Sequence, residues 1–248
     1  MNLIIDIGNS RTKLAVFEYV TLKERTICSS NEIEKKIKEI LENWSNITHS
    51  IISNTSSYPI EHLNFLEKYT IVLQLNQFTS VPYTNNYNTP ETLGLDRIGL
   101  VAGSAKTYSN ENVLIIDAGT CITYDFIDST NKYHGGSISP GLQMRFKAMH
   151  EFTAKLPLLK ATDNVNLIGK STSESMQSGA ILGTCNEIDG FINRYKEKYP
   201  DLTVIFTGGD ADFLSKRIKN SIFANSNFLL EGLNHILEFN KDTWLNDL

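Results

Sequence analysis

The chain has few cysteines and no long apolar run, and both absences exclude classes of protein. Its three cysteines among 248 residues contain no CxxC pair, which predicts reduced thiols and disfavours a disulfide scaffold. No stretch approaches the roughly 18 apolar residues of a membrane span. The N-terminus starts with a strand-like run instead of a basic and then apolar leader. We therefore expect a cytoplasmic protein with no membrane partner.

The chain also lacks an excess of positive charge. Its 23 lysines and arginines are outnumbered by 28 acidic residues, giving a formal net charge of −5 at pH 7. Without a basic stripe to offset phosphates, we expect no nucleic-acid partner. The five histidines show no metal-ligand spacing, which disfavours a zinc enzyme.

The chain contains the same short sequence pattern at two places. Leu3–Ser10 and Leu114–Cys121 each read as an apolar run, Asp-x-Gly and a small polar residue, and another apolar run follows each. Each unit predicts a β-hairpin whose turn can hold phosphate: glycine lets the backbone approach, turn N–H groups bind oxygen, and the carboxylate holds a cation. One such turn is typical of an ordinary hairpin corner, but the pair predicts a nucleotide site in a duplicated fold.

The expected elements indicate an α/β protein with mixed sheets and flanking helices, because hairpins force antiparallel pairs into the sheets. Periodicity predicts helices over 33–44, 61–69, 96–105, 142–152, 172–200 and 229–239. Buried strands are expected at 51–52 and 204–206, a further strand at 71–75, and loops at 79–92 and 157–169. No linker separates the halves, so we expect domains 1–110 and 111–248 to pack around a central cleft.

The first turn offers a carboxylate followed by hydrogen-bond donors and positive charge. Asp6 follows the apolar run, and the side chains after it are Asn9, Ser10, Arg11, Thr12 and Lys13. Taken from the residues alone, the two turn aspartates, Asp6 and Asp117, hold the Mg²⁺ of a nucleotide, through water at Asp6. The alternative is a solvated hairpin with no ligand.

A second constellation is Gly94–Arg97, at the start of a predicted helix. Asp96 there can be a helix-start residue favoured by the dipole. With Arg97 beside it, the pair also suits an acidic alcohol, because Asp96 can accept the hydroxyl proton and the planar guanidinium can hold the acid group.

Two further positions are more ambiguous. Thr207–Ala211 follows a buried strand, and its two glycines would let a flat ligand such as adenosine lie on the backbone, although it can equally be a plain strand-to-helix turn. Cys121 lies at the second turn, but no histidine is near it in sequence, so we interpret it as a small buried residue.

Together these motifs resemble the type III pantothenate kinases of the actin, hexokinase and acetate-kinase superfamily. The resemblance covers nearly the whole chain and keeps the order of the motifs, which here are Asp6–Ser10, Gly94–Arg97, Asp117–Thr120, Gly135–Gly141, Thr153–Pro157, Gly169–Thr172 and Thr207–Gly209. It implies two duplicated actin/hexokinase-like, ribonuclease H-like domains. It also implies ATP-dependent phosphorylation of pantothenate, the first step toward coenzyme A.

The resemblance assigns roles residue by residue. Asp96 would accept the proton of the pantoyl hydroxyl. Pantothenate would be bound by Tyr87, Gly94, Leu95, Asp96, Arg97 and Thr172. ATP would be contacted by Asp6, Ile7, Gly8, Asn9, Ser10, Arg11, Thr12, Lys13 and Thr120. Asp117 would ligate a monovalent cation, K⁺ or NH₄⁺, in place of the Mg²⁺ assigned above, and the family implies a homodimer.

Two competing functions use the same residues. A sugar kinase of the same superfamily would give Arg97 less to do, since its acceptor is neutral, and such chains are usually longer. A nucleotide-binding regulator would bind ATP without turnover, and the intact pair of Asp96 and Arg97 argues against it.

Overall fold

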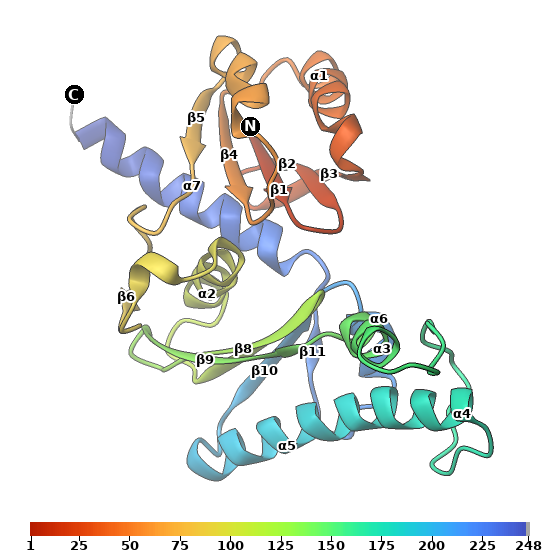
Figure 1. Cartoon of the computed structure of the whole chain (residues 1–248). Helices are drawn as coiled ribbons and strands as arrows, with labels where there is room; N and C mark the ends of the chain where they lie inside the picture. Colours follow the sequence, from red (N-terminus) through yellow and green to blue (C-terminus); the bar gives the residue numbers. More distant parts are fainter. Residues whose placement is uncertain (247–248) are drawn as a thin grey trace. The chain divides into compact units, whose positions relative to one another are not determined.

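The computed structural model describes residues 1–246, and the side chains of residues 1–241 (Figure 1). The chain forms two compact units. Within the described residues, the first comprises 1–109, 131–133 and 227–246, and the second comprises 110–130 and 134–226. The division of the chain into two duplicated halves, 1–110 and 111–248, stays a prediction.

The first unit is built on a five-stranded mixed sheet in the order β3-β2-β1-β4-β5. Its strands are β1 (Asn2–Ile7), β2 (Thr12–Glu18), β3 (Thr21–Cys28), β4 (His49–Asn54) and β5 (Ile71–Gln74). β1 is antiparallel to β2 and parallel to β4, which confirms the first hairpin. All six residues of β1 are buried, because helices cover both faces of the sheet at this strand.

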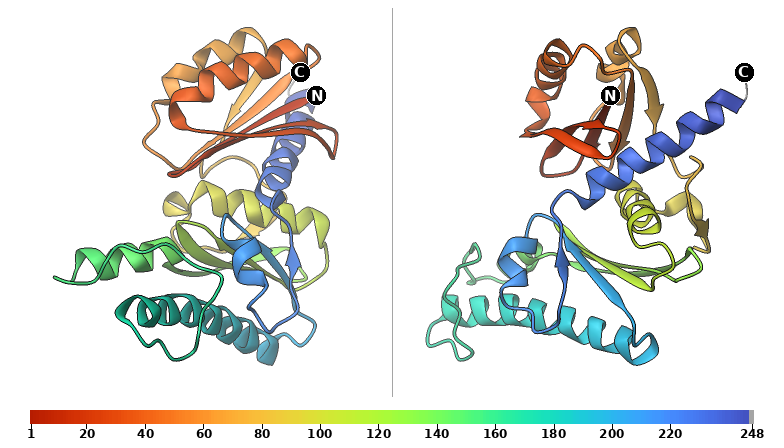
Figure 2. Two further views of the ribbon diagram at one scale, coloured as in Figure 1. Left: turned by 90° about the vertical axis from the view of Figure 1, so that its right-hand side faces the viewer. Right: turned by 180° about the vertical axis from the view of Figure 1, so that it is seen from behind.

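The helices of the first unit bury the apolar residues that lie at helical spacing in the sequence. They are α1 (Ile33–Asn43), α2 (Leu95–Thr107) and α7 (Phe228–Asn246), with 3-10 turns η1 (Ser30–Glu32), η2 (Ile60–Lys68) and η3 (Pro90–Thr92). α1 buries Ile33, Ile37 and Ile40, as the periodicity predicts. Figure 2 shows α1 and η2 on one face of the sheet and α7 on the other. A helix is predicted over 61–69, and η2 at this place is a 3-10 helix.

α2 is held close to α7 by small residues on both helices. A Cβ at Gly232 would collide with the carbonyl oxygen of Gly99, and one at Gly103 would lie 3.3 Å from the Cα of Gly232. Larger side chains would force the two helices apart. This contact matters for function because Asp96 and Arg97 are in the first turn of α2.

The second unit contains most of a six-stranded sheet, whose first five strands follow the order β11-β10-β7-β8-β9. Its strands are β7 (Val113–Ala118), β8 (Cys121–Ile127), β9 (Lys132–Pro140), β10 (Thr203–Thr207) and β11 (Phe223–Ala224). β7 and β8 are antiparallel, which confirms the second hairpin, while β10 runs parallel to β7. The predicted loop at 79–92 contains β6 (Thr84–Asn85), which pairs with the first two residues of β9.

Helices α3 (Leu142–Glu151), α4 (Thr172–Gln177), α5 (Gly183–Lys198) and α6 (Ala211–Ser215) belong to the second unit. The predicted long helix is observed, with a π-helical segment (Ser178–Leu182) between α4 and α5. α3 buries Leu142 and Phe146. Phe152, the last residue of the helix predicted over 142–152, is 85% exposed, because α3 ends one residue before it. α7 in the first unit is longer than the predicted 229–239.

A search of the described helices finds none that is both long and apolar enough to span a bilayer.

Candidate functional site

The first Asp-x-Gly turn closes tightly between β1 and β2. The Gly8 N–H donates to the carbonyl oxygen of Arg11 at 3.2 Å, and the Asn9 side-chain amide donates to the Thr55 carbonyl at 3.2 Å. Asn9, Ser10 and Arg11 are exposed. The turn therefore presents the Ser10 hydroxyl and the positive charge of Arg11 at the surface, groups that suit a phosphate.

Asp6 stands behind this turn as a buried carboxylate with 5% of its surface exposed. Burial raises the pKa of Asp6 from its ordinary 3.8 to about 6; the positive charge of Lys13 opposes this rise and the negative charge of Asp96 adds to it. The charges of Lys13 and Asp96 thus both act on Asp6 within the first unit. A carboxylate that burial destabilises in its ionised form is a natural partner for a bound cation.

This carboxylate fits Mg²⁺ delivered with a nucleotide and does not fit a protein-built metal cage. Among the described residues, no group of three or more His, Cys, Asp or Glu side chains is placed to hold an ion. Mg²⁺ usually keeps several waters and takes one or two carboxylates together with substrate phosphates.

Two residues assigned to ATP have no exposed side chain. Ile7 and Thr12 are both fully buried at the ends of β1 and β2. Their side chains support the turn from within the core, so any contact with a nucleotide would be made by their backbones. The sequence does not show which residues of a continuous motif contribute their side chains and which contribute only their backbones.

Asp96 is oriented by its own helix start. Its carboxylate Oδ1 accepts a hydrogen bond from the backbone N–H of Arg97 at 2.8 Å. A Cβ at Gly94 would lie 2.5 Å from the same oxygen, so glycine at this position leaves room for the carboxylate. The helix-start interpretation and the catalytic one are therefore both compatible with the geometry, since the second carboxylate oxygen is not used by this bond.

Arg97 belongs to a stack of aromatic rings. Its side chain is buried, with 4% exposed, and its Cζ lies 5.4 Å from the centre of the Tyr87 ring. Tyr87 in turn stacks on Tyr133, with ring centres 6.1 Å apart and an interplanar angle of 21°. Cation–π contact and stacking fix the direction of the guanidinium. The structure thus brings Tyr87 and Arg97 together, as the assignment of both to one substrate requires.

Tyr133 is the residue that sequence reasoning missed. It is fully buried, and Tyr83 meets its ring edge-on at 6.1 Å between centres. Tyr133 is the second residue of β9, and its only sequence signal is the cluster of tyrosines in the loop over 79–92.

The second Asp-x-Gly turn is enclosed by backbone from two other segments. The Gly141 N–H donates to the Thr120 carbonyl at 3.1 Å, and the Asp210 N–H donates to the Ala118 carbonyl at 2.9 Å. Gly208 has φ +103°, and a Cβ there would collide with an Asp117 carboxylate oxygen. The predicted glycine turn at Thr207–Ala211 therefore packs directly on the second turn, which its position in the sequence did not show.

Two aspartates, Asp117 and Asp210, lie at this turn. Asp117 is half-buried beside Gly208, and burial raises the pKa of Asp210 at the start of α6. Cys121, interpreted from sequence as buried, is half-buried at the start of β8. The Asp117 carboxylate is a hard oxygen donor, a ligand type that suits hard cations.

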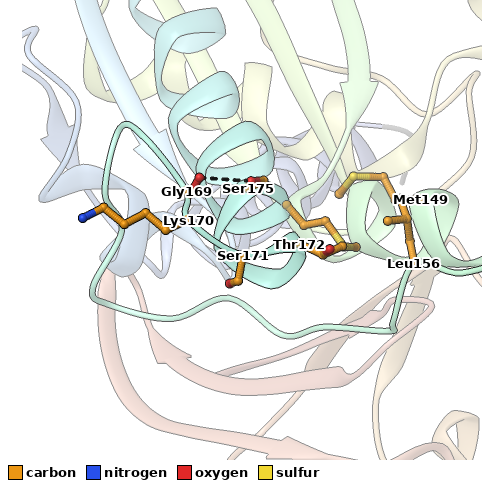
Figure 3. Close-up of a pocket in the computed structure, with 8 residues that line it drawn as sticks. Met149, Leu156, Gly169, Lys170, Ser171, Thr172 and Ser175 are labelled. Carbon is orange, nitrogen blue, oxygen red and sulfur yellow. Dashed lines mark hydrogen bonds between the residues drawn. The ribbon is translucent and has the colours of Figure 1, made fainter.

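Thr172 lies on the wall of a cavity of about 740 Å³ in the second unit. Figure 3 shows Lys170, Ser171 and Thr172 along its edge, with Met149 and Leu156 opposite. The Ser175 hydroxyl donates to the Gly169 carbonyl at 3.5 Å, and the Ser171 hydroxyl caps the helix by accepting from the Glu174 N–H at 3.2 Å. Asp117 and Thr120 do not line this cavity.

Comparison with solved structures identifies the fold. A candidate transcriptional activator of the Baf family from Campylobacter jejuni matches with a TM-score of 0.63 and 22% identity, over 97% of this chain and 99% of that one. A glucokinase from an Antarctic psychrotroph matches with a TM-score of 0.51 and 11% identity, over 96% and 98%. The predicted actin/hexokinase-like α/β fold is confirmed.

Comparison of sequences identifies the family. The family model described as type III pantothenate kinase matches residues 2–194. The type III pantothenate kinase of Christiangramia forsetii is 50% identical over 97% of this chain and 99% of its own length, and that of Flavobacterium johnsoniae is 44% identical over 98% and 99%. The chain belongs to the type III pantothenate kinase family.

Proposed function

We propose that this protein transfers the γ-phosphoryl group of ATP to pantothenate, giving 4′-phosphopantothenate in the first step of coenzyme A biosynthesis. Family membership supports the reaction. The observation that carries the assignment of residues is the placement of Asp96 and Arg97 at the start of α2, where the charge of Asp96 acts on the buried Asp6 of the first phosphate turn.

Asp96 is the proton acceptor in this proposal. Phosphoryl transfer passes through a loose transition state, so the proton leaves the pantoyl hydroxyl late and the direction of the accepting carboxylate matters most. The bond from the Arg97 N–H directs one oxygen of Asp96 and leaves the other for the hydroxyl. Pantothenate is bound by Tyr87 and by the segment Gly94–Arg97, and Thr172 completes the set.

ATP is held by the segment Asp6–Lys13 and by Thr120. Exposed donors and Arg11 of the first turn bind phosphate oxygens, and Asp6 would hold the nucleotide's Mg²⁺. When bound, that Mg²⁺ would supply charge stabilisation for the transferred group. Asp117 holds the monovalent cation, K⁺ or NH₄⁺.

Replacing Arg97 by lysine should raise the KM for pantothenate at least tenfold more than the KM for ATP. Lysine cannot reproduce a bidentate contact with the acceptor's carboxylate, nor the stacking on Tyr87. The measurement is initial rates with each substrate varied in turn. Tyr133→Leu is the matched variant, because it removes the ring behind Tyr87 and should give a smaller change in the same direction. Equal changes in both KM values would remove Arg97 from acceptor binding.

Replacing Asp117 by asparagine should raise the K⁺ concentration needed for half-maximal rate, about tenfold or more, as for loss of a metal ligand's charge. The Mg²⁺ requirement should change little if Asp6 is the residue that orients Mg²⁺. K⁺ is titrated at fixed ionic strength with Na⁺ as replacement, on wild type and variant. A wild type that runs equally well in Na⁺ alone would contradict the cation role.

The reaction itself is tested by ADP release with pantothenate, with and without K⁺. A panel of sugars provides the neutral acceptors for comparison. ADP release only with pantothenate supports the proposal, and release with a sugar would identify a sugar kinase. Nucleotide binding without turnover on any acceptor would identify a regulator.

The assembly and location of the protein are part of the same proposal. Homodimerisation follows the family resemblance, and sedimentation at micromolar concentration tests it. A cytoplasmic location is supported by the three free cysteines, which a reducing compartment keeps as thiols.

A further inference from the structure

The second phosphate turn is in contact with the end of β9. The Gly141 N–H donates to the Thr120 carbonyl at 3.1 Å. A Cβ at Gly141 would collide with the carbonyl oxygens of both Gly119 and Thr120. The backbone at Pro140 and Gly141 therefore sets how far the turn can move on this side.

One arginine holds the residues just before Gly141. Arg145, in the first turn of α3, donates from Nε to the Pro140 carbonyl at 3.0 Å and from Nη2 to the Ser139 hydroxyl at 2.9 Å. These bonds fasten the end of β9 to α3 at the position where the chain meets the turn.

Arg145 is itself fixed by a carboxylate on another helix. Its Nη2 lies 2.5 Å from Glu187 Oε2, on α5, and Glu187 Oε1 accepts a hydrogen bond from the Tyr124 hydroxyl at 2.9 Å. The Tyr124 side chain is fully buried in β8 and stacks on Phe191 with ring centres 4.2 Å apart. Arg145, Glu187 and Tyr124 thereby connect β8, β9, α3 and α5.

The charge states of this cluster are well defined. Burial alone would raise the pKa of Glu187, but hydrogen bonds from Arg145, Ser139 and Tyr124 outweigh it and hold that pKa below its ordinary value. Burial first, and then the charge of Glu187, raise the pKa of Tyr124. Glu187 is therefore ionised and Tyr124 is a neutral donor at physiological pH.

We propose that the ion pair of Arg145 and Glu187 is a positioning device for the second phosphate turn, and that it tunes nucleotide affinity without touching the nucleotide. The inference rests on the proposed function only in taking Thr120 as a nucleotide contact. The two side chains are only 20% and 24% exposed, so removing one of them entirely would leave a mostly buried charge without its partner. Conservative replacements that can still form a hydrogen bond should instead loosen the turn while the fold persists.

Glu187→Gln and Arg145→Lys test this inference. Each should weaken binding of Mg·ADP about tenfold, at the low end of losses for residues that support a ligand shell. The KM for ATP should rise by a similar factor, and the KM for pantothenate should stay within about twofold. The double variant should be no weaker than the worse single variant, because both changes break one device.

The control variant is Asp163→Asn, which removes another ion pair of the second unit, with Arg217 at 3.2 Å. It should leave Mg·ADP binding unchanged. Thermal unfolding is measured for all variants. If Glu187→Gln lowers the unfolding temperature but binds Mg·ADP like wild type, the pair is structural and the inference is wrong.

Calorimetric binding of Mg·ADP needs no acceptor, so the two proposals can fail separately. If the wild type does not turn over pantothenate but Glu187→Gln still weakens Mg·ADP binding, the proposed function fails and the inference stands. If pantothenate is phosphorylated and both KM values rise equally in Glu187→Gln, the function stands and the inference fails.

Discussion

Replacing Asp96 by asparagine is expected to lower turnover by on the order of 10² to 10⁴-fold while pantothenate and ATP bind almost normally. Asparagine can still accept the hydrogen bond that the Arg97 N–H makes to Asp96 at 2.8 Å, so the start of α2 should keep its shape. What asparagine cannot do is accept the hydroxyl proton. Single-turnover rates and equilibrium binding of each substrate separate the two effects.

Gly94→Ala is the matched variant for this prediction. The backbone at Gly94 has φ −60° and ψ 137°, which alanine adopts without strain. Its Cβ would meet the Asp96 carboxylate at 2.5 Å, and that carboxylate can swing away. We expect normal stability and reduced turnover, because the acceptor is displaced and not removed. Near-wild-type turnover in Asp96→Asn would end the assignment of Asp96 as proton acceptor.

The hairpins and their turns could be predicted from sequence because their signals are local. An apolar run, a glycine turn and a second apolar run specify a hairpin within about 15 residues, and both hairpins are observed. The start of α2 was predictable for the same reason. Asp96, Arg97 and the helical spacing after them lie in one continuous segment.

Contacts between distant segments could not be predicted. Tyr133 supports Tyr87 from 46 positions away, and Glu187 holds Arg145 from 42 positions away. Neither pairing leaves a periodic or motif signal in the chain. Phe152 shows a related failure, because helical spacing extends one residue past the point where α3 ends, and that single residue decides whether the ring is buried.

The sequence predicts that Asp6 lies beside phosphate, but it does not predict how deeply this carboxylate is buried. The motif indicates a carboxylate beside phosphate, yet only the fold shows that it is almost completely buried between β2 and β4. That burial leads to a prediction about stability as well as function.

Replacing Asp6 by asparagine is expected to make the ligand-free protein more stable, relative to wild type, as pH rises. The pKa of Asp6 is about 6 in the folded protein and 3.8 when unperturbed. Between these values the folded state binds the proton and the unfolded state does not, so the contribution of Asp6 to stability is complete below 3.8 and is lost as pH rises through about 6. At about 1.4 kcal/mol per pKa unit, the loss reaches about 3 kcal/mol above pH 7. Asparagine carries no such charge.

Urea unfolding of wild type and Asp6→Asn between pH 4.5 and 8 measures this difference. The free energy of unfolding of the variant minus that of wild type should grow with pH and level off above about pH 7. A difference that is constant over this range would mean that the carboxylate is not destabilised by burial, and the cation-binding argument for Asp6 would lose its basis.

Nucleotide binding by Asp6→Asn should become weaker although the ligand-free variant is more stable. A cation near the ionised Asp6 offsets the unfavourable buried charge, so the variant should bind Mg·ADP on the order of 10 to 100-fold more weakly. Below about pH 6, wild type must release the Asp6 proton when Mg·ADP binds, and the variant has none to release. Calorimetry at pH 5.5 in two buffers of different ionisation enthalpy counts that proton. If wild type and variant release equal numbers of protons, Asp6 is not the group that the bound nucleotide and its cation ionise.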